Sequence, residues 1–458
     1  MKYKFLLEFI LFVIPTAMII YFIKQRIQMR KLFNFRHDYK KGKKKLKQKN
    51  LNNENAVLLG FNGRKPVYST DNAKHIFVCG TTGSGKTVAL SNYMQNCMTK
   101  DFPMLIVDGK GDTGKGSILD VLTQLNKKYH KKIYCINLTN PSMSDTYNPF
   151  YKTFPTVAKD MLINMTDWSE EHYKVNAERY LQRLVLLLNK ADMTLSFRTI
   201  VKYMELEHFS QLSMYLVKKK IITKEQHLEN LEIAKTSGKI AENSIARFST
   251  IAESELGEIF SDTGIDITKA IQEKAIILFI LNPLIYPEIS SAFGRLILID
   301  SKKAINQSFQ TPERTFFIFD EINVYASKTL IDLVNKSRSA NVTCVLATQS
   351  LSDLASAEDE NFTQQIIENC NNYLVLRQNS AVNSENWANI LGTKPTMEVT
   401  YQLRQDGFDT TQTGYGSARS VRAFLYHPDE IKQLQTGNGI FLSRDNYFHS
   451  KIRINKPF

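Results

Sequence analysis

The hydrophobic residues of this chain gather in short continuous runs, separated by longer stretches in which polar and apolar residues mix. A continuous apolar run of five to seven residues is typical of a strand whose two faces are both covered, as in a parallel sheet. The runs are residues 75–79, 103–108, 132–138, 275–281, 315–320, 342–348, 373–377 and 439–443. Because helical stretches lie between them, the pattern predicts an α/β domain with a doubly wound, mostly parallel sheet.

Residues 155–270 interrupt this alternation. Residues 171–190 carry apolar side chains at helical spacing. Further segments of the same character are residues 197–206, 210–219, 224–235 and 239–251. We therefore expect an all-helical subdomain inserted between the third and fourth strands. Its apolar stripes are expected to form its own core, since an amphipathic helix ordinarily buries that face.

The amino-terminal segment has a different hydrophobic pattern. Residues 5–23 are mostly apolar, interrupted by Glu8, Pro15 and Thr16, and are long enough to cross a hydrocarbon core of about 30 Å once. Twelve lysines and arginines follow in residues 24–50, against two lysines ahead of the run. The positive-inside rule then puts the carboxy-terminal side in the cytoplasm. A cleaved signal peptide is disfavoured because the charge asymmetry is reversed and no small-residue cleavage site follows.

The net charge of +14 comes mainly from this same end of the chain. Residues 1–50 hold fourteen basic and two acidic residues, or +12, which leaves +2 for the rest. A basic segment beside a membrane span attracts anionic lipid head groups. A nucleic-acid-binding tail is a second interpretation of the same residues. Bulk charge therefore gives no sign of a nucleic-acid surface on the body itself.

A complete phosphate-binding loop follows the first predicted strand and precedes a predicted helix. It consists of Gly80, Thr81, Thr82, Gly83, Ser84, Gly85, Lys86 and Thr87. Strand, G-x-x-x-x-G-K-T and helix, in that order, is the context that this motif requires. The loop's backbone N–H groups and the helix N-terminus favour a polyphosphate. Lys86 is expected to reach the β- and γ-phosphates, and the Thr87 hydroxyl to bind Mg²⁺.

Two further motifs complete the expected nucleotide site. Asp320 ends a predicted strand and can hold Mg²⁺, directly or through water. Glu321 comes next and is placed to act as the general base toward the attacking water. Gln349 follows the next predicted strand, where a polar side chain can sense the γ-phosphate. An acidic pair that merely ends a strand is the alternative, which the phosphate loop upstream disfavours.

The order of these motifs resembles that of the TraG/TraD-type coupling proteins of conjugative DNA transfer, within the HerA/FtsK superfamily of RecA-like ATPases. The resemblance runs from about residue 55 to the carboxy-terminus. Besides the phosphate loop, its motifs are residues 108–112 (Asp-Gly-Lys-Gly-Asp), 148–149, 317–321, 336–339, 347–352 and 427–431. The resemblance implies a RecA-like fold and a membrane-anchored hexameric ATPase that uses ATP and Mg²⁺.

The resemblance also implies partners and one further site residue. Such proteins receive DNA, expected as a relaxase-bound single strand, and pass it to a type IV secretion channel in the inner membrane. The inserted helices correspond to the family's all-alpha domain. Arg338 matches an arginine finger that completes the neighbouring subunit's site, for which a guanidinium is well suited. A plain arginine at a helix end, after a predicted helix over Lys328–Ser337, is the alternative.

The chain departs from the family pattern in three places. It has one predicted membrane helix where many members have two, and Gly109 where the family has proline. It also ends about fifteen residues after its last predicted strand, without a long acidic tail. Two other functions therefore stay open: a double-strand DNA translocase of the FtsK class, and a secretion-energising ATPase that acts on protein.

These expectations divide the chain into five parts. The predicted parts are a membrane anchor (1–23), a basic linker (24–54), the first part of the RecA-like domain (55–154), the all-alpha insertion (155–270) and the second part of the RecA-like domain (271–458).

Overall fold

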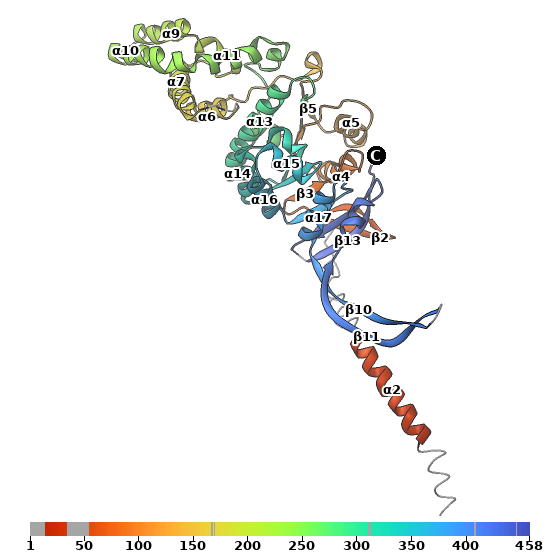
Figure 1. Cartoon of the computed structure of the whole chain (residues 1–458). Coiled ribbons are helices and arrows are strands. Elements are labelled where there is room, and N and C mark those ends of the chain that lie inside the picture. The colour runs from red at the N-terminus through yellow and green to blue at the C-terminus, as the bar shows by residue number, and fades with distance from the viewer. Residues whose placement is uncertain are drawn as a thin grey trace, which may run out of the picture.

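The protein folds around one large mixed sheet, as the computed structural model in Figure 1 shows. The structure describes residues 14–33, 55–165, 168, 170–309, 313–406, 409–445 and 447–458. The sheet has eleven strands in the order β2-β1-β13-β12-β9-β3-β8-β7-β4-β6-β5. A separate two-stranded ribbon, β10 with β11, extends from this body.

The parallel part of the sheet contains seven of the eight predicted strands. In spatial order they are β9 (Asn372–Val375), β3 (Ile76–Cys79), β8 (Val342–Thr348), β7 (Thr315–Asp320), β4 (Met104–Asp108), β6 (Ile276–Ile280) and β5 (Ile133–Asn137). Most of these strands are buried along their whole length, which explains their continuous apolar sequences.

The remaining strands form an antiparallel extension beside β9. The predicted run at 439–443 is β12 (Asn438–Ser443), which runs antiparallel to β9 rather than parallel to the others. It is not the last strand, because β13 (Phe448–Ile454) follows it and pairs with β1 (Ala56–Asn62), and β1 pairs with β2 (Lys65–Thr70). Buried and exposed residues alternate along β13, so no continuous apolar run marks it.

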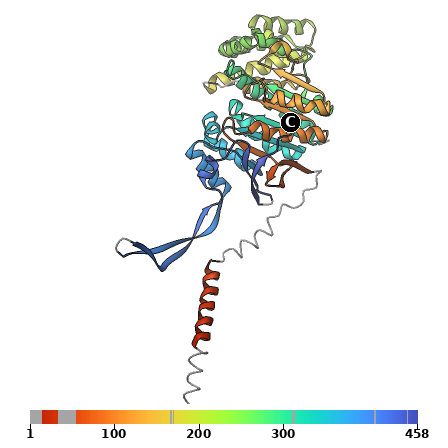
Figure 2. The same cartoon turned by 90° about the vertical axis from the view of Figure 1, so that its right-hand side faces the viewer.

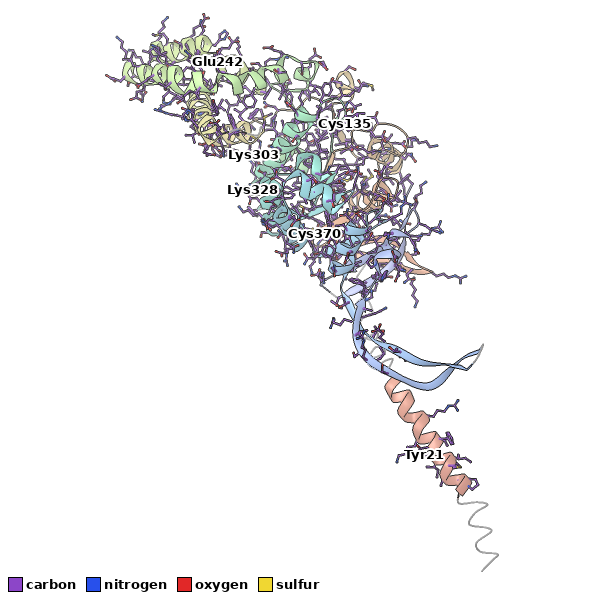
Figure 3. The ribbon with its side chains drawn as sticks, viewed as in Figure 1. Tyr21, Cys135, Glu242, Lys303, Lys328 and Cys370 are labelled. Carbon is purple, nitrogen blue, oxygen red and sulfur yellow. The ribbon has the colours of Figure 1, made fainter. Side chains whose placement is uncertain are left out.

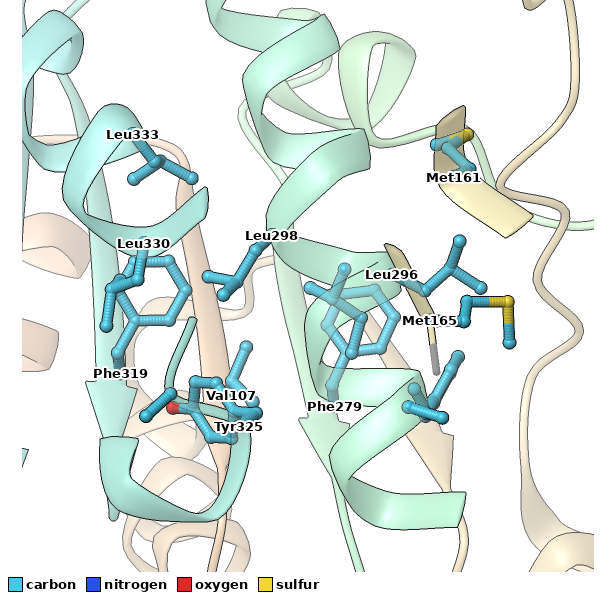
Figure 4. Packing of buried hydrophobic residues seen from close by; sticks show 14 of the residues in the cluster. Val107, Met161, Met165, Phe279, Leu296, Leu298, Phe319, Tyr325, Leu330 and Leu333 are labelled. Atoms are coloured by element: carbon cyan, nitrogen blue, oxygen red, sulfur yellow. The ribbon is translucent and has the colours of Figure 1, made fainter. Parts of the chain in front are cut away.

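Helices cover both faces of the parallel strands. One face packs against α4 (Lys86–Thr99) and α5 (Ile118–Tyr129). The other packs against α13 (Pro287–Ser308), α14 (Lys328–Ser337), α16 (Glu360–Asn369) and α17 (Ala381–Leu391). In Figure 4, Leu330 and Leu333 of α14 lie above Phe319 of β7, beside Leu298 of α13. This is the doubly wound arrangement that the hydrophobic pattern predicts.

A run of helices separates β5 from β6. They are α6 (Pro155–Met165), α7 (Glu171–Lys190), α8 (Phe197–Met204), α9 (Leu206–Lys218), α10 (Lys224–Ile233), α11 (Lys239–Glu253) and α12 (Ile267–Gln272). A π-helical turn, Ala234–Gly238, joins α10 to α11. Their apolar side chains are buried among one another, and the side chains of the group continue into the core above the sheet. The boundaries predicted for the insertion, residues 155 and 270, remain predictions.

The β10–β11 ribbon was not predicted. Strands β10 (Thr393–Asp406) and β11 (Asp409–Phe424) pair antiparallel along nearly their whole length, with an irregularity between Tyr401 and Leu403. Figure 2 shows this ribbon on the same side of the body as α2, while the helices of the insertion lie at the far end. Figure 3 makes the same separation visible, with Tyr21 of α2 and Glu242 of α11 at opposite ends of the molecule.

Helix α2 (Ile14–Phe33) contains the second part of the predicted membrane span. The first part of that span, residues 5–13, lies outside the described residues. Searched over the described ranges, the chain has no helix that combines the length and the apolar character needed to cross a membrane. The side chains of residues 18–23 are nevertheless all large and more than half exposed, from 52% to 64%.

Candidate nucleotide-binding site

The phosphate loop connects β3 to α4, as its sequence predicts. Gly83 and Gly85 have φ angles of 74° and 111°, in the left-handed region that side-chain-bearing residues rarely adopt. The Gly80 amide donates to the Thr348 carbonyl at 3.2 Å, which ties the loop to the end of β8. The Ser84 hydroxyl donates to the Thr81 carbonyl at 2.6 Å and closes the turn. All eight loop residues therefore lie at the carboxyl edge of the parallel sheet.

Four predicted side chains meet beside this loop. The Lys86 ammonium donates to the Gly80 carbonyl at 2.9 Å and lies 3.2 Å from Oε1 of Glu321. Nε2 of Gln349 donates to the same Glu321 oxygen at 3.2 Å. The Thr82 hydroxyl in turn donates to Oε1 of Gln349 at 3.1 Å. The structure thus joins the phosphate loop, the end of β7 and the end of β8 into one polar network.

The acidic pair at the end of β7 is almost completely buried. Asp320 is 3% exposed and Glu321 5% exposed, yet Oδ1 of Asp320 and Oε2 of Glu321 have no hydrogen-bond partner among the described residues. Burial, reinforced by the charges of Glu321 and Asp108, raises the pKa of Asp320 to about 8. Burial raises the pKa of Asp108 to about 6. Oxygen ligands with unused lone pairs suit Mg²⁺, so these residues fit the predicted metal site. Thr87, the second residue of α4, is half-buried beside Lys86.

Glu321 has a left-handed backbone, with φ 48° and ψ 54°. Such a conformation is uncommon for a glutamate and persists only where the surrounding structure enforces it. Gly109 lies directly against this turn: a Cβ there would come within 2.7 Å of the Asp320 carbonyl and 2.9 Å of the Glu321 carbonyl. The absence of a side chain at Gly109 therefore allows the end of β4 to approach the acidic turn.

Two residues that the sequence did not single out also touch the loop. The Thr436 hydroxyl donates to the Gly83 carbonyl at 3.2 Å, and the Gly437 amide donates to the Ser84 carbonyl at 3.0 Å. Gly437 has a left-handed backbone, with φ 79°, and a glycine at this position is a local signal for a turn. No local signal indicates that this turn rests on a loop so distant along the chain.

Arg338 does not lie at this site. It is exposed and follows the last residue of α14, just ahead of the first residue of β8. Val342, which opens β8, pairs with Thr315, which opens β7. Arg338 is therefore at the amino edge of the parallel strands, whereas the phosphate loop is at their carboxyl edge. The arginine cannot serve the nucleotide site of its own chain.

Residues 314–436 match a family described as the TraM recognition site of TraD and TraG. This segment contains β7, the acidic pair, β8, Gln349 and the β10–β11 ribbon. An uncharacterized protein of Mycoplasma pneumoniae is 31% identical over 100 residues, which cover 22% of this chain and 67% of that protein.

Several solved structures share the fold. The bacterial conjugative coupling protein TrwBdeltaN70, in its unbound monoclinic form, matches with a TM-score of 0.62 and 15% identity over 88% of this chain and 89% of that chain. Plasmid coupling protein TrwB in complex with ADP and Mg²⁺ matches with a TM-score of 0.58, also at 15% identity, with the same coverage. VirB4 of Thermoanaerobacter pseudethanolicus matches with a TM-score of 0.57 and 12% identity over 88% and 96% of the two chains.

Proposed function

We propose that this chain is a coupling protein of the TraG/TraD type, a membrane-anchored ATPase that couples ATP hydrolysis to DNA transfer through a conjugative type IV secretion system. The observation that carries the ATPase activity is the network in which Lys86 of the phosphate loop, Glu321 after β7 and Gln349 after β8 contact one another. These three positions come from separate strands, and a parallel sheet brings such strand ends to one edge, where α/β proteins bind ligands.

The cofactors are ATP and Mg²⁺. The backbone N–H groups of residues 80–87 would hold the phosphates, and Thr87 and Asp320 would hold the metal ion, which would supply positive charge beside the phosphoryl oxygens. Lys86 exchanges the Glu321 carboxylate for phosphate oxygens when the nucleotide binds. Glu321 is then free to accept a proton from the attacking water as general base, while Gln349 orients that water.

DNA is the proposed substrate, presented as a relaxase-bound single strand and delivered to the secretion channel. The resemblance of the motifs to those of coupling proteins supports this proposal, together with the match of residues 314–436 to a family described as the TraM recognition site of TraD and TraG. The net charge of the body gives no support to DNA binding, because residues 51–458 contribute only +2 of the net +14. Recognition of DNA must then depend on a local surface or on partner proteins.

The anchor is proposed to be a single membrane-spanning helix that includes the start of α2, with the body in the cytoplasm and the protein in the inner membrane. Residues 18–23 support it, because six consecutive large apolar side chains exposed around a helix are costly in water and favourable in lipid. The basic residues that follow would lie against anionic lipid head groups.

The active form is proposed to be a ring of six copies in which Arg338 completes a neighbour's site. Arg338 lies on the opposite edge of the sheet from its own phosphate loop, so it reaches a triphosphate only across an interface between copies. Its guanidinium then stabilises charge on the γ-phosphate in the transition state.

The central experiment measures ATP hydrolysis by the full-length protein with single-stranded DNA, with double-stranded DNA and with no DNA. We expect single-stranded DNA to increase the rate of ATP hydrolysis by the wild-type protein, and we expect no hydrolysis by the Lys86→Ala variant. Stimulation only by double-stranded DNA would support an FtsK-class translocase instead. Hydrolysis that no DNA changes would overturn DNA coupling and favour a secretion ATPase that acts on protein.

A further inference from the structure

Asp108 lies next to the acidic pair although the two are far apart in the sequence. It ends β4, and in the parallel pairing of β4 with β7 its partner is Asp320. Paired residues of parallel strands project their side chains to the same face of a sheet. On this face Ile106 and Ile318 pack in one cluster with residues of α4. The two aspartates therefore face the helix that begins with Lys86.

The Asp108 carboxylate is held in place by its own chain. It is 2% exposed, and its Oδ1 accepts the backbone N–H groups of Lys110 at 2.9 Å and Gly111 at 3.4 Å. Both backbone N–H groups donate to Oδ1, and neither donates to the second carboxylate oxygen, Oδ2. The side chain is thus fixed in orientation, with one oxygen committed to the turn after β4.

The carboxyl groups at this edge of the sheet outnumber the basic side chains that pair with them. Lys86 pairs with Glu321, and in the described part of the chain neither Asp108 nor Asp320 forms an ion pair. Oδ1 of Asp320 is buried and has no hydrogen-bond partner there. A buried carboxyl group without a counter-charge takes up a proton or binds a cation, so this pair of aspartates can accommodate an additional cation.

We propose that Asp108 is a second carboxylate of the Mg²⁺ site, where it holds the water shell of the ion beside Asp320. This deepens the proposed function and rests on it. Mg²⁺ in nucleotide sites is bound through one or two carboxylates together with phosphate oxygens, and it keeps several of its waters. Carboxylates that bind such waters orient the ion and raise its affinity.

The alternative is that Asp108 only shapes the turn after β4. The two roles separate in the Asp108→Asn variant, because the amide oxygen still accepts both backbone N–H groups while the negative charge is lost. Asp108→Ser is a second variant without the charge, since a serine hydroxyl also accepts from a backbone N–H two residues on. Asp112→Asn is the matched control, because the Asp112 side chain is 40% exposed and pairs with Lys110 on the surface.

The experiment measures the dissociation constant of a fluorescent ADP analogue for full-length protein, once with EDTA and once with Mg²⁺. The ratio of the two constants reports metal binding without any need for hydrolysis. We expect Asp108→Asn and Asp108→Ser to reduce the gain from Mg²⁺ by about 10-fold or more and to leave the constant in EDTA nearly unchanged. Asp112→Asn should keep the wild-type ratio, and melting temperatures show that each variant is folded.

Asp320→Asn distinguishes the failure of this inference from the failure of the proposed metal site. If Asp320→Asn abolishes the gain from Mg²⁺ and both Asp108 variants keep it, Asp108 shapes the turn only and the inference is wrong. If Asp320→Asn also keeps the gain, the metal site itself is misassigned and the proposed function loses its Mg²⁺ ligand. Loss of affinity in EDTA as well as in Mg²⁺ would likewise assign Asp108 to the loop rather than to the ion.

Discussion

The hydroxyl of Thr436 donates a hydrogen bond to the carbonyl of Gly83 at 3.2 Å, although 353 positions separate the two residues. The next residue, Gly437, donates its amide to Ser84, and Gly437 in turn accepts from the amide of Ile454. The carboxy-terminal strands therefore support the phosphate loop from the side of the antiparallel extension. Nucleotide binding should depend on this support.

Thr436→Val should weaken nucleotide binding by about 2- to 5-fold, because it removes one exposed hydrogen bond worth about 0.5–1 kcal/mol and keeps the shape of the side chain. Thr436→Ser keeps the hydroxyl and should bind like the wild type. Titration with a fluorescent ADP analogue measures the difference. Equal affinity of the valine and wild-type proteins would mean that the contact does not position the loop.

Lys86→Ala should abolish hydrolysis while the protein stays folded, because the change removes the charge that binds the phosphates and little core packing. Lys110→Ala is the matched control, since Lys110 is an exposed lysine near the same edge of the sheet and pairs with Asp112. Phosphate release and circular dichroism give the two readouts. Normal turnover in purified Lys86→Ala protein would disprove the site assignment.

Glu321→Gln should still bind ATP but turn it over about 10²- to 10⁴-fold more slowly, the usual contribution of a general base. The amide oxygen can still accept from Gln349, so the network at the strand ends is kept. Single-turnover hydrolysis with pre-bound ATP isolates the chemical step. A rate equal to the wild type would remove Glu321 from the mechanism.

His75 should make the protein less stable in mild acid. Burial lowers the pKa of His75 from 6.5 to about 4, and its Nδ1 accepts the backbone N–H of Cys344 at 3.0 Å. The unfolded chain takes up a proton near pH 6.5 while the folded chain does not, so stability present above pH 6.5 is lost as pH falls toward 4.

The size of this loss is about 3 kcal/mol across that window. His75→Asn keeps an acceptor near the position of Nδ1 and cannot titrate, so its unfolding free energy, measured in urea, should vary less between pH 6.5 and 4. An identical pH dependence in both proteins would show that other groups control the acid sensitivity.

Arg338→Ala should lose most ATPase activity in the assembled protein, since an arginine finger typically supplies about 10³- to 10⁵-fold in rate. Mixing it with Lys86→Ala protein should restore part of the activity, because some interfaces then pair an intact phosphate loop with an intact arginine. Lys336→Ala, a nearby change at another exposed basic residue, is the control. If assembled Arg338→Ala protein hydrolyses ATP normally, the arginine is only a helix-end residue.

Elements that depend on short stretches of sequence could be predicted without the structure. The phosphate loop is recognised from eight consecutive residues. Six of the seven parallel strands are buried along their whole length, so their sequences are continuous apolar runs. Helices α7 and α14 have the limits that their apolar spacing predicts. Strands of one parallel sheet end at one edge, so the meeting of Lys86, Glu321 and Gln349 also followed from their positions after strands.

Contacts between segments that are distant along the chain became known only from the folded structure. Strands β2 and β13 were missed because strands that alternate buried and exposed residues carry mixed sequences. The short apolar run of β1 and the mixed sequence of the β10–β11 ribbon were missed as well. The pairing of Asp108 with Asp320 depends on strand order, which crossovers set and local sequence does not. Strand order and packing also place Thr436 against Gly83. They likewise place Arg338 at the edge of the sheet opposite its own phosphate loop. Each depends on packing between segments that no short window of sequence contains.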